Sequence, residues 1–256
     1  MLDVKDVSLS FAGNQVLNGV DFSVQRGEVL GLIGPNGAGK TSIMNVITGI
    51  HRPKEGGVRF GDTSISRLPP HQIASMGLRR TFQTSLLCNG LSVVENVMLG
   101  LEPQNSYNIW SALVAGKTAR AWENEARERS MEMLEWMGMA RFADRPGQSL
   151  SFGQQRLVEI SRAMVSHPDV LLLDEPAVGL TAPRVEELAE KIKSIRDNFG
   201  TSILLIEHVM QLVLSACDRV VVMATGTVIA DGPPEEVTRD PAVIESYLGR
   251  GYYVES

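Results

Sequence analysis

Gly34-Pro-Asn-Gly-Ala-Gly-Lys-Thr41 is the stretch that predicts most about the fold of this chain. It fits the pattern G-x-x-x-x-G-K-[ST], a loop whose backbone N–H groups point at phosphate oxygens. Four fixed positions give a chance match in a chain of this length a probability of roughly 1% at average residue frequencies. Residues 28–33 are typical of a short buried strand, and residues 41–47 begin a helix with an apolar face. This order predicts a nucleotide-phosphate site rather than an ordinary glycine-rich turn.

The parts of this phosphate loop have separate predicted roles. The loop leads into a helix N-terminus, whose dipole favours anions. Lys40 supplies a positive charge for the outer phosphates, and Thr41 supplies a hydroxyl for Mg²⁺. The other candidate nucleotide-binding residues in and after the loop are Gly34, Asn36, Gly37, Gly39 and Ser42.

Length and composition predict an ordinary globular protein. The 256 residues are 43% hydrophobic and 21% charged, which suits one large domain or two small ones. A formal charge of −6 gives no basic footprint for nonspecific nucleic-acid binding. The longest apolar run, residues 109–115, is far too short to span a membrane, and residues 1–6 lack a signal-peptide pattern. We expect Cys88 and Cys217 to be small packing residues in a reducing cytosol.

The first thirty residues alternate like antiparallel strands, and one further strand is predicted near residue 58. Residues 2–11 and 16–24 flank a turn at Gly13-Asn14, and residues 58–60 follow a glycine break. We therefore expect an all-β lobe beside the phosphate loop.

The middle of the chain has a helical pattern. Residues 121–137 repeat apolar side chains at helical spacing and end at Gly138, which predicts an amphipathic helix with methionines as core filler. Residues 102–118 are typical of a loop or a short helix and indicate no function.

The last third of the chain has the rhythm of strand, helix, strand. Residues 170–173 and 202–206 are continuous apolar runs of the kind found in buried parallel strands. Residues 183–198 form a helical pattern between them, and residues 220–230 predict a hairpin. A crossover helix between buried strands implies a parallel sheet covered on both faces.

Asp174-Glu175 follows the first of these buried runs. In a chain with a phosphate loop, a carboxylate at a strand tip suits an acid that supports Mg²⁺, and Glu175 suits a group that polarises an attacking water. A capping pair that begins the next segment explains the same residues equally well. Both alternatives stay open from these residues alone.

Residues 150–155 lead into a second helical pattern. Ser151 is predicted as the N-cap, and the helix start behind it is receptive to anions. Taken alone, a merely capped helix is the favoured interpretation.

Together these motifs resemble those of the ATP-binding cassette (ABC) ATPases, over nearly the whole chain. The motifs that carry the resemblance are, in order, Gly34 to Thr41, Thr81-Phe-Gln83, Leu150 to Gln155, Leu173-Asp-Glu-Pro176 and Glu207-His208. They are similar to that family's phosphate loop, glutamine loop, signature, acidic strand end and switch histidine. Five motifs in this order are very specific, and together they weigh against the simpler alternative for each.

The resemblance implies an α/β fold, that of an ABC-type P-loop NTPase. A RecA-like core with an antiparallel β lobe would be joined by an α-helical signature subdomain. Within a single ABC ATPase domain, we expect the β lobe and phosphate loop over 1–83 and the helical subdomain over 84–159. The rest of the core would cover 160–235, and a C-terminal helical tail 236–256.

The resemblance also implies catalytic roles, with ATP and Mg²⁺ as cofactors. Glu175 would be the general base, and His208 would hold the γ-phosphate and the attacking water. Gln83 would touch Mg²⁺ and that water and report to a membrane partner. Asp174, Thr41 and Gln83 would support the metal.

Nucleotide contacts beyond the phosphate loop are implied in the same way. Phe11 would stack on the adenine. Ser151, Gly153 and Gln154 would bind the γ-phosphate of the nucleotide held by the opposite subunit.

Two residues depart from the family pattern. Phe152 stands where a second glycine is usual in the signature, although an aromatic there is familiar in one branch. Thr181 stands where Asp or Asn is usual, in a segment that bridges the two sites of a dimer. Thr181 puts the coupling between those sites in doubt, and the effect of either residue on turnover is not legible.

The branch indicated is that of the branched-chain (hydrophobic) amino acid importer ATPases. Phe152, the stretch 102–118, residues 206–208 and the ending Ser246-Tyr-Leu-Gly249 carry this similarity. We therefore expect a peripheral ATPase subunit on the cytoplasmic face of the inner membrane. Its partners would be a second ATPase, identical or paralogous, two transmembrane permeases and, indirectly, a periplasmic solute-binding protein, with no nucleic acid.

Other functions stay as alternatives. For a transport ATPase, the alternative to an amino acid as solute is urea, lipopolysaccharide or another organic compound. A soluble ABC ATPase of DNA repair would need a coiled-coil insertion, and no sustained heptads separate the motifs. A non-catalytic regulatory module is opposed by the intact Lys40, Glu175 and His208.

Overall fold

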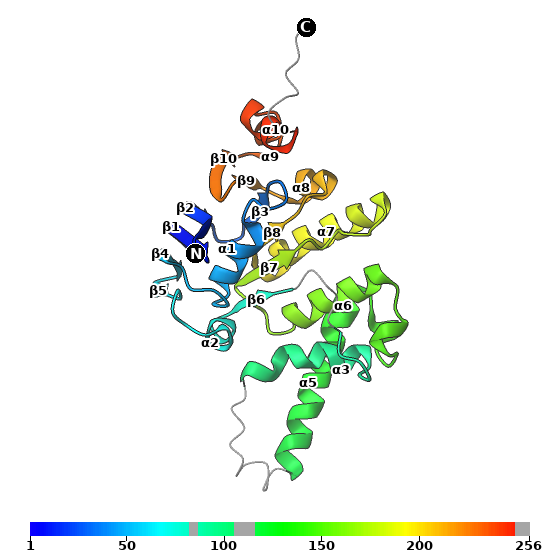
Figure 1. Ribbon diagram of the computed structural model, residues 1–256. Helices are drawn as coiled ribbons and strands as arrows, with labels where there is room; N and C mark the ends of the chain where they lie inside the picture. Colours follow the sequence, from blue (N-terminus) through cyan, green and yellow to red (C-terminus); the bar gives the residue numbers. More distant parts are fainter. Residues whose placement is uncertain (82–86, 105–115, 249–256) are drawn as a thin grey trace. The chain divides into compact units, whose positions relative to one another are not determined.

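The computed structural model (Figure 1) describes residues 1–81, 87–104 and 116–248. It contains two compact units, one made of residues 1–80 with the described residues from 169 onward, the other of the described residues within 81–168. The expected boundary between residues 159 and 160 falls inside α6 (Phe152–Met164), one continuous helix whose last turns are buried. Because the helix does not break there, the second unit continues to residue 168.

The expected antiparallel lobe is confirmed in the first unit. Its sheet has the strand order β2-β1-β4-β5. These strands are β1 (Leu2–Phe11), β2 (Asn14–Val24), β4 (Glu55–Phe60) and β5 (Thr63–Ser64). β1 and β2 meet in a tight hairpin, where Ala12 and Gly13 take positive φ angles of 48° and 88°.

The second sheet of this unit is the expected parallel one, with the order β10-β9-β3-β8-β7-β6. Its strands are β3 (Val29–Ile33), β6 (Leu78–Arg80), β7 (Val170–Asp174), β8 (Ser202–Ile206), β9 (Arg219–Ala224) and β10 (Thr227–Gly232). Only the β9–β10 pair is antiparallel among the pairings of these strands, as the predicted hairpin requires. β3, β8 and β7 are neighbours, so their carboxyl ends lie at one edge.

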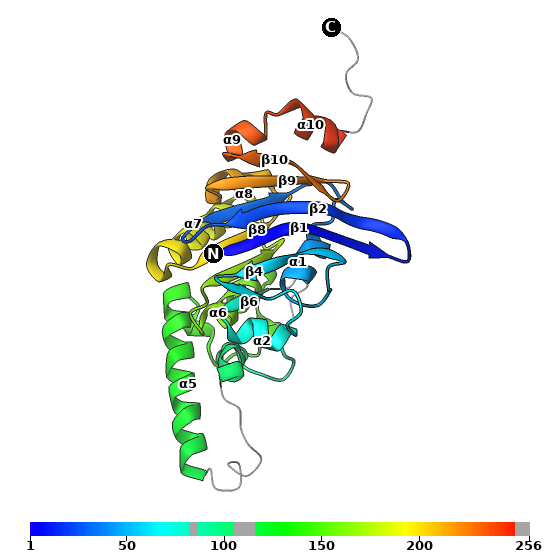
Figure 2. The same ribbon diagram turned by 90° about the vertical axis from the view of Figure 1, so that its left-hand side faces the viewer.

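Both faces of the parallel sheet are covered, as Figures 1 and 2 show. Successive strand residues point to opposite faces. Leu30 and Leu32 join a core with the antiparallel sheet and α1 (Lys40–Ile47). Ile33 joins a second core with residues of β9, of α8 (Met210–Ala216) and of the C-terminal helices.

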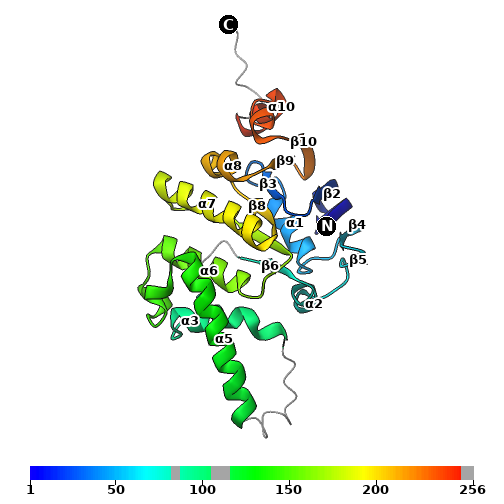
Figure 3. The same ribbon diagram turned by 180° about the vertical axis from the view of Figure 1, so that it is seen from behind.

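Further helices complete the first unit. They are α2 (Pro70–Ser75), α7 (Ala182–Phe199), α9 (Pro234–Val237) and α10 (Pro241–Leu248). α7 is the predicted crossover between β7 and β8, and it lies beside α8 on the sheet (Figure 3). Val237 and Val243 anchor α9 and α10 in the second core.

The second unit is helical. It contains α3 (Val93–Met98), a 3₁₀ helix (Leu99–Gln104), α5 (Gly116–Met137), two short 3₁₀ turns (Ala140–Phe142 and Gly147–Ser149) and α6. α5 contains the predicted helix, and Met133 and Met137 are buried as core filler. Of the stretch 102–118, residues 105–115 lie outside the described residues. Along the part of the chain that the structure describes, no helix is both long and apolar enough for a membrane span.

The two cysteines have different surroundings. Cys88 is exposed, so the expectation that it packs in the interior is wrong. Cys217 packs closely on β3, where a Cβ at Gly31 would lie 2.9 Å from its Sγ. Burial raises the pKa of the Cys217 thiol to about 12, with help from the negative charges of Asp218 and Glu207.

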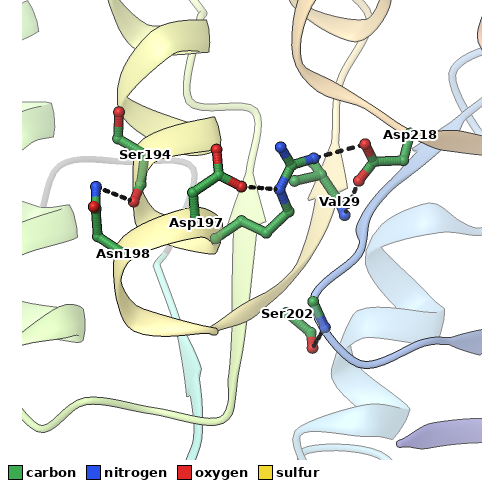
Figure 4. A network of polar contacts seen from close by, with 8 residues as sticks. Val29, Ser194, Asp197, Asn198, Ser202 and Asp218 are labelled. Atoms are coloured by element: carbon green, nitrogen blue, oxygen red, sulfur yellow. Dashed lines mark hydrogen bonds and ion pairs between the residues drawn. The ribbon is translucent and has the colours of Figure 1, made fainter.

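A polar network fastens the amino ends of the parallel strands (Figure 4). Asp218 accepts hydrogen bonds from the backbone N–H of Val29, at 2.8 Å, and from the Arg196 guanidinium, at 2.6 Å. Arg196 also donates to Asp197, and the Ser202 hydroxyl accepts from the N–H of Gly27 at 2.9 Å. This network ties α7, β3, β8 and the turn before β9 together at the edge opposite the phosphate loop.

We expect Asp218→Ala to lower the free energy of unfolding by about 1–2 kcal/mol, because a backbone N–H and a guanidinium lose a partly exposed charged acceptor. Urea unfolding would measure the change. Asp21→Ala is the control, since its exposed ion pair with Lys5 spans 3.7 Å and contributes little. Equal stabilities for both variants would contradict a fastening role for Asp218.

Candidate nucleotide site

Two glycines let the phosphate loop lie close to the rest of the fold. A Cβ at Gly34 would overlap the carbonyl oxygen of Met223 on β9. Gly39, at φ 100°, caps α1, and a Cβ there would lie 2.7 Å from a methyl of Leu17. Only glycine fits such positions without strain or displacement.

The loop is also tied to the β9–β10 turn. The N–H of Gly226 donates to the carbonyl of Ala38 at 3.1 Å, and the carbonyl of Gly226 accepts from Asn18 on β2 at 2.9 Å. Inside the loop, the N–H of Ala38 donates to Pro35 at 3.2 Å. Strands from both sheets of the unit therefore fix the loop before any ligand binds.

Lys40 is folded against this loop. Its ammonium donates to the carbonyls of Gly34, at 2.6 Å, and Pro35, at 3.1 Å. Burial lowers the pKa of Lys40, and the nearby charges of Glu175 and Asp174 act in the opposite direction. The cation expected for phosphate thus lies close to both predicted acidic residues.

The other predicted loop residues face outward or lie at the surface. Asn36, Gly37 and Thr41 are exposed, and Ser42 is half-buried. Their N–H and hydroxyl groups are therefore accessible to a ligand at the N-terminus of α1.

Asp174 ends β7 in a buried ion pair that the sequence did not predict. Arg80 on β6 donates to its carboxylate at 2.8 Å. The same guanidinium donates to Asn45 on α1, at 2.7 Å, and to Thr48 at the C-cap of α1, at 3.3 Å. Arg80 therefore links the acidic strand end to the helix behind the phosphate loop. The only signal in the sequence was a basic residue three positions before Gln83.

The side chains of Glu175 and His208 lie close together. Glu175 follows β7 with φ 48°, a left-handed conformation that is costly for a non-glycine residue and is found at functional sites. Its N–H donates to the carbonyl of Ile206, at the end of β8, at 2.9 Å. Glu175 Oε1 and His208 Nδ1 are 3.8 Å apart, and the His208 side chain is 53% exposed.

Glu207 was left without a role by the sequence, yet it is fully buried. Its carboxylate accepts hydrogen bonds from the N–H groups of Ala177, at 2.7 Å, His208, at 3.0 Å, and Val209, at 3.1 Å. Burial raises the pKa of Glu207, while these three donors act to lower it. Its position beside His208 was the only sequence signal.

Phe11 lies at the end of β1 and is 44% exposed, so its ring is accessible to a ligand. His51 packs edge-on against it, with the ring centroids 5.1 Å apart. The sequence did not single out His51.

The predicted signature begins α6 in the second unit. Ser151 and Gln154 form a reciprocal cap: the Ser151 hydroxyl accepts from the Gln154 N–H, and the Gln154 side chain accepts from the Ser151 N–H. The capped helix proposed as the simpler alternative is therefore present. Gly153 lies in the first turn of α6. Phe152 is exposed, and the Arg156 guanidinium lies over its ring, with the guanidinium carbon 5.8 Å from the ring centre.

Two predicted residues remain apart from these clusters. Gln83 lies outside the described residues. Thr181 is exposed at the N-cap of α7, where its side chain makes no capping hydrogen bond.

The side-chain oxygens of Asp174 and Thr41 suit a Mg²⁺ ion bound together with a nucleotide. No group of three or more His, Cys, Asp or Glu side chains among the described residues could hold a metal ion. Mg²⁺ in nucleotide enzymes needs no such cage, because phosphates, waters and one or two protein oxygens complete its shell. The buried Asp174 carboxylate and the exposed Thr41 hydroxyl fit that pattern.

Comparison with known families agrees with this arrangement. A family model described as "ABC transporter" matches residues 17–178, more than half of the chain. The chain belongs to the ABC transporter family. A second model, described as "Branched-chain amino acid ATP-binding cassette transporter", matches residues 227–253.

Individual relatives cover nearly the full length. The chain is 39% identical to the high-affinity branched-chain amino acid transport ATP-binding protein LivG of Escherichia coli, over 97% of this chain and 98% of that protein. An ABC transporter cassette solved in its ADP conformation matches with a TM-score of 0.85 and 33% identity, over 97% and 98% of the two chains. A dimeric post-hydrolysis cassette with ADP and phosphate shares the fold, at a TM-score of 0.75 and 23% identity, over 91% and 99%.

The predicted family, branch and fold are thus confirmed. The chain is the ATP-binding subunit of an ABC transporter, an ATPase that couples hydrolysis to transport. ATP is its nucleotide, and cassettes of this fold are known as dimers.

We expect Lys40→Ala to raise the dissociation constant of ATP, measured with Mg²⁺ present, by about 10- to 100-fold. A charge-assisted hydrogen bond is worth about 1.5–3 kcal/mol, and about 1.4 kcal/mol corresponds to a factor of ten. Equilibrium binding of a fluorescent ATP analogue would measure it, with the exposed Lys5→Ala as control. Unchanged affinity would mean that Gly34 to Thr41 is only a turn.

Proposed function

We propose that this ATPase powers the import of branched-chain, hydrophobic amino acids. The support for this solute is the model matched by residues 227–253 and the similarity to LivG. The chain itself contains no described feature that would contact a solute. Urea, lipopolysaccharide and other organic compounds are the alternatives, and the solute is recognised by partner proteins.

The observation that carries the catalytic proposal is the convergence of strand ends. β3, β8 and β7 are adjacent and parallel, so the phosphate loop, His208 and Glu175 follow their carboxyl ends at one edge. This is where ligands bind in open α/β sheets.

Each residue of the site then has its own proposed role in ATP hydrolysis. Lys40 and the N–H groups at the start of α1 bind the phosphates. Glu175 accepts a proton from the attacking water as general base, and His208, within reach of Glu175, orients that water and the γ-phosphate. Thr41 and Asp174 would hold Mg²⁺, which would supply charge neutralisation on the phosphates. Phe11 stacks on the adenine.

The remaining proposed roles involve other subunits of the transporter. Ser151, Gly153 and Gln154 at the start of α6 bind the γ-phosphate of a nucleotide held by another ATPase, identical or paralogous. Gln83, which lies outside the described residues, would contact Mg²⁺ and the attacking water and report the nucleotide state to a permease. We place the complex on the cytoplasmic face of the membrane, with two permeases and an external solute-binding protein.

We expect Glu175→Gln to lower the hydrolysis rate by about 10²–10⁴-fold, because a positioned general base contributes that much. ATP binding should persist, and ATP-bound dimers should accumulate. Phosphate release, ATP binding and size-exclusion chromatography with ATP would measure these effects. Glu187→Gln on the exposed face of α7 is the matched control. Near-normal turnover in the Glu175 variant would exclude the assignment.

The solute is tested by reconstitution with the proposed permease and solute-binding partners. We expect leucine, isoleucine and valine to bind that binding protein and to stimulate ATP hydrolysis in proteoliposomes. Urea and acidic amino acids are the control solutes. Failure of the branched-chain amino acids in both assays would reject the solute proposal, and absence of any associated membrane protein would reject the importer.

A further inference from the structure

We propose that Glu207 is a positioning residue for ATP hydrolysis, whose buried carboxylate holds the segment after Glu175 and the segment of His208 in a fixed relation. This inference rests on the proposed roles of Glu175 and His208. Glu207 itself touches neither nucleotide nor water in the proposal; it acts through the backbone of both segments.

The hydrogen bonds support this geometry directly. One carboxylate oxygen accepts from the N–H of Ala177, two residues beyond Glu175, at 2.7 Å. The other oxygen accepts from the N–H groups of His208 and Val209, at 3.0 and 3.1 Å. One side chain therefore joins the loops that follow β7 and β8.

A second link between the same loops shows how they are held. The N–H of Glu175 donates to Ile206, the last residue of β8. Glu175 keeps its costly positive φ only because surrounding contacts hold it there. The Glu207 bonds lie on the far side of Glu175 from β7, so the strained residue is fixed from both directions.

The residue type is informative because burying a carboxylate is costly. A glutamine of the same shape offers one acceptor oxygen and two donors, so it cannot accept from both loops at once. The NH₂ group of the glutamine would instead face a backbone N–H, so that two hydrogen-bond donors meet. Only a carboxylate accepts with both oxygens, which explains a buried acid at this position in chemical terms.

Replacement of Glu207 should slow the hydrolysis step and leave ATP binding unchanged. The phosphate loop, Lys40 and Phe11 make no hydrogen bond to Glu207 that the structure describes, so ATP affinity should be unchanged in Glu207→Gln. Catalytic groups displaced by about 1 Å lose up to about 10²-fold in rate, so we expect kcat to fall about 10- to 100-fold.

Asp218→Asn is the matched control. Asp218 also accepts a backbone N–H at a strand end, that of Val29, but at the opposite edge of the same sheet. We expect it to lower stability while kcat per folded molecule stays at the wild-type value. Glu207→Asp keeps the charge on a shorter side chain and should retain more activity than Glu207→Gln; it also serves if the glutamine variant does not fold.

The experiment measures kcat, KM, equilibrium ATP binding and urea unfolding for each variant, with a double mutant in the His208→Ala background. If Glu207 acts in part through His208, Glu207→Gln lowers kcat by a smaller factor in the His208→Ala background than in the wild type. Wild-type kcat in Glu207→Gln would overturn the inference. So would a loss of ATP affinity and stability together, or full additivity with His208→Ala. Normal ATP hydrolysis by Glu175→Gln would contradict the assignment of Glu175 as the general base. Loss of hydrolysis in Glu175→Gln together with a wild-type rate in Glu207→Gln would contradict only the inference about Glu207.

Discussion

Parallel pairing of three buried strands is the constraint on which the site depends. β3, β8 and β7 pair in register through residues that are apolar and fully buried on both faces, apart from the polar strand ends. Because the chain leaves each strand at the same edge, three segments distant in sequence deliver a phosphate loop, an acid and a histidine to one place. No hydrogen bond between these side chains is needed to bring them together. The hydrophobic effect acting on the sheet does so, and local bonds then adjust the angles.

The local bonds are dominated by the cost of burying charge. Lys40, Asp174 and Glu207 are all buried, and each is satisfied by named partners. Asp174 is neutralised by Arg80, which also reaches α1, so the ion pair that compensates the acid also braces the helix of the phosphate loop. Glu207 is satisfied by backbone N–H groups instead. Buried polar groups that are fully paired make a rigid site, whereas one unpaired member would cost more than an apolar side chain.

The exposed residues of the site have a different character. Phe11, Thr41, His208 and the signature residue Phe152 all lie at the surface of their units, without the enclosing contacts that hold the buried charges. Such residues gain their energetic value only when a ligand or a partner covers them. This agrees with the proposal that a nucleotide and a second subunit complete the catalytic site.

The sequence by itself determined the fold class, the family and the candidate site. Local hydrophobic patterns predicted the secondary-structure elements: alternation for the antiparallel strands, continuous apolar runs for the buried parallel strands, and helical spacing for the crossover helix. The phosphate loop was predicted because its motif demands particular residue types at short spacing, whereas Glu175 and His208 were predicted through the resemblance to the ABC ATPases. The subdomain boundary expected between residues 159 and 160 divides α6, and the expected packing of Cys88 was wrong, since the limits of a compact unit and the burial of a residue depend on neighbours far along the chain.

Tertiary structure alone decided the connections among these motifs. Arg80 and Asp174 are 94 positions apart, and Glu207 and Ala177 are 30 apart. No local pattern marks such pairs, because their partners are a side chain on another strand and backbone groups of another loop. The left-handed conformation of Glu175 was equally hidden, since a non-glycine residue adopts it only where surrounding contacts outweigh the strain. Sequence patterns record which chemistry is present, and only the folded sheet fixes how the groups are held.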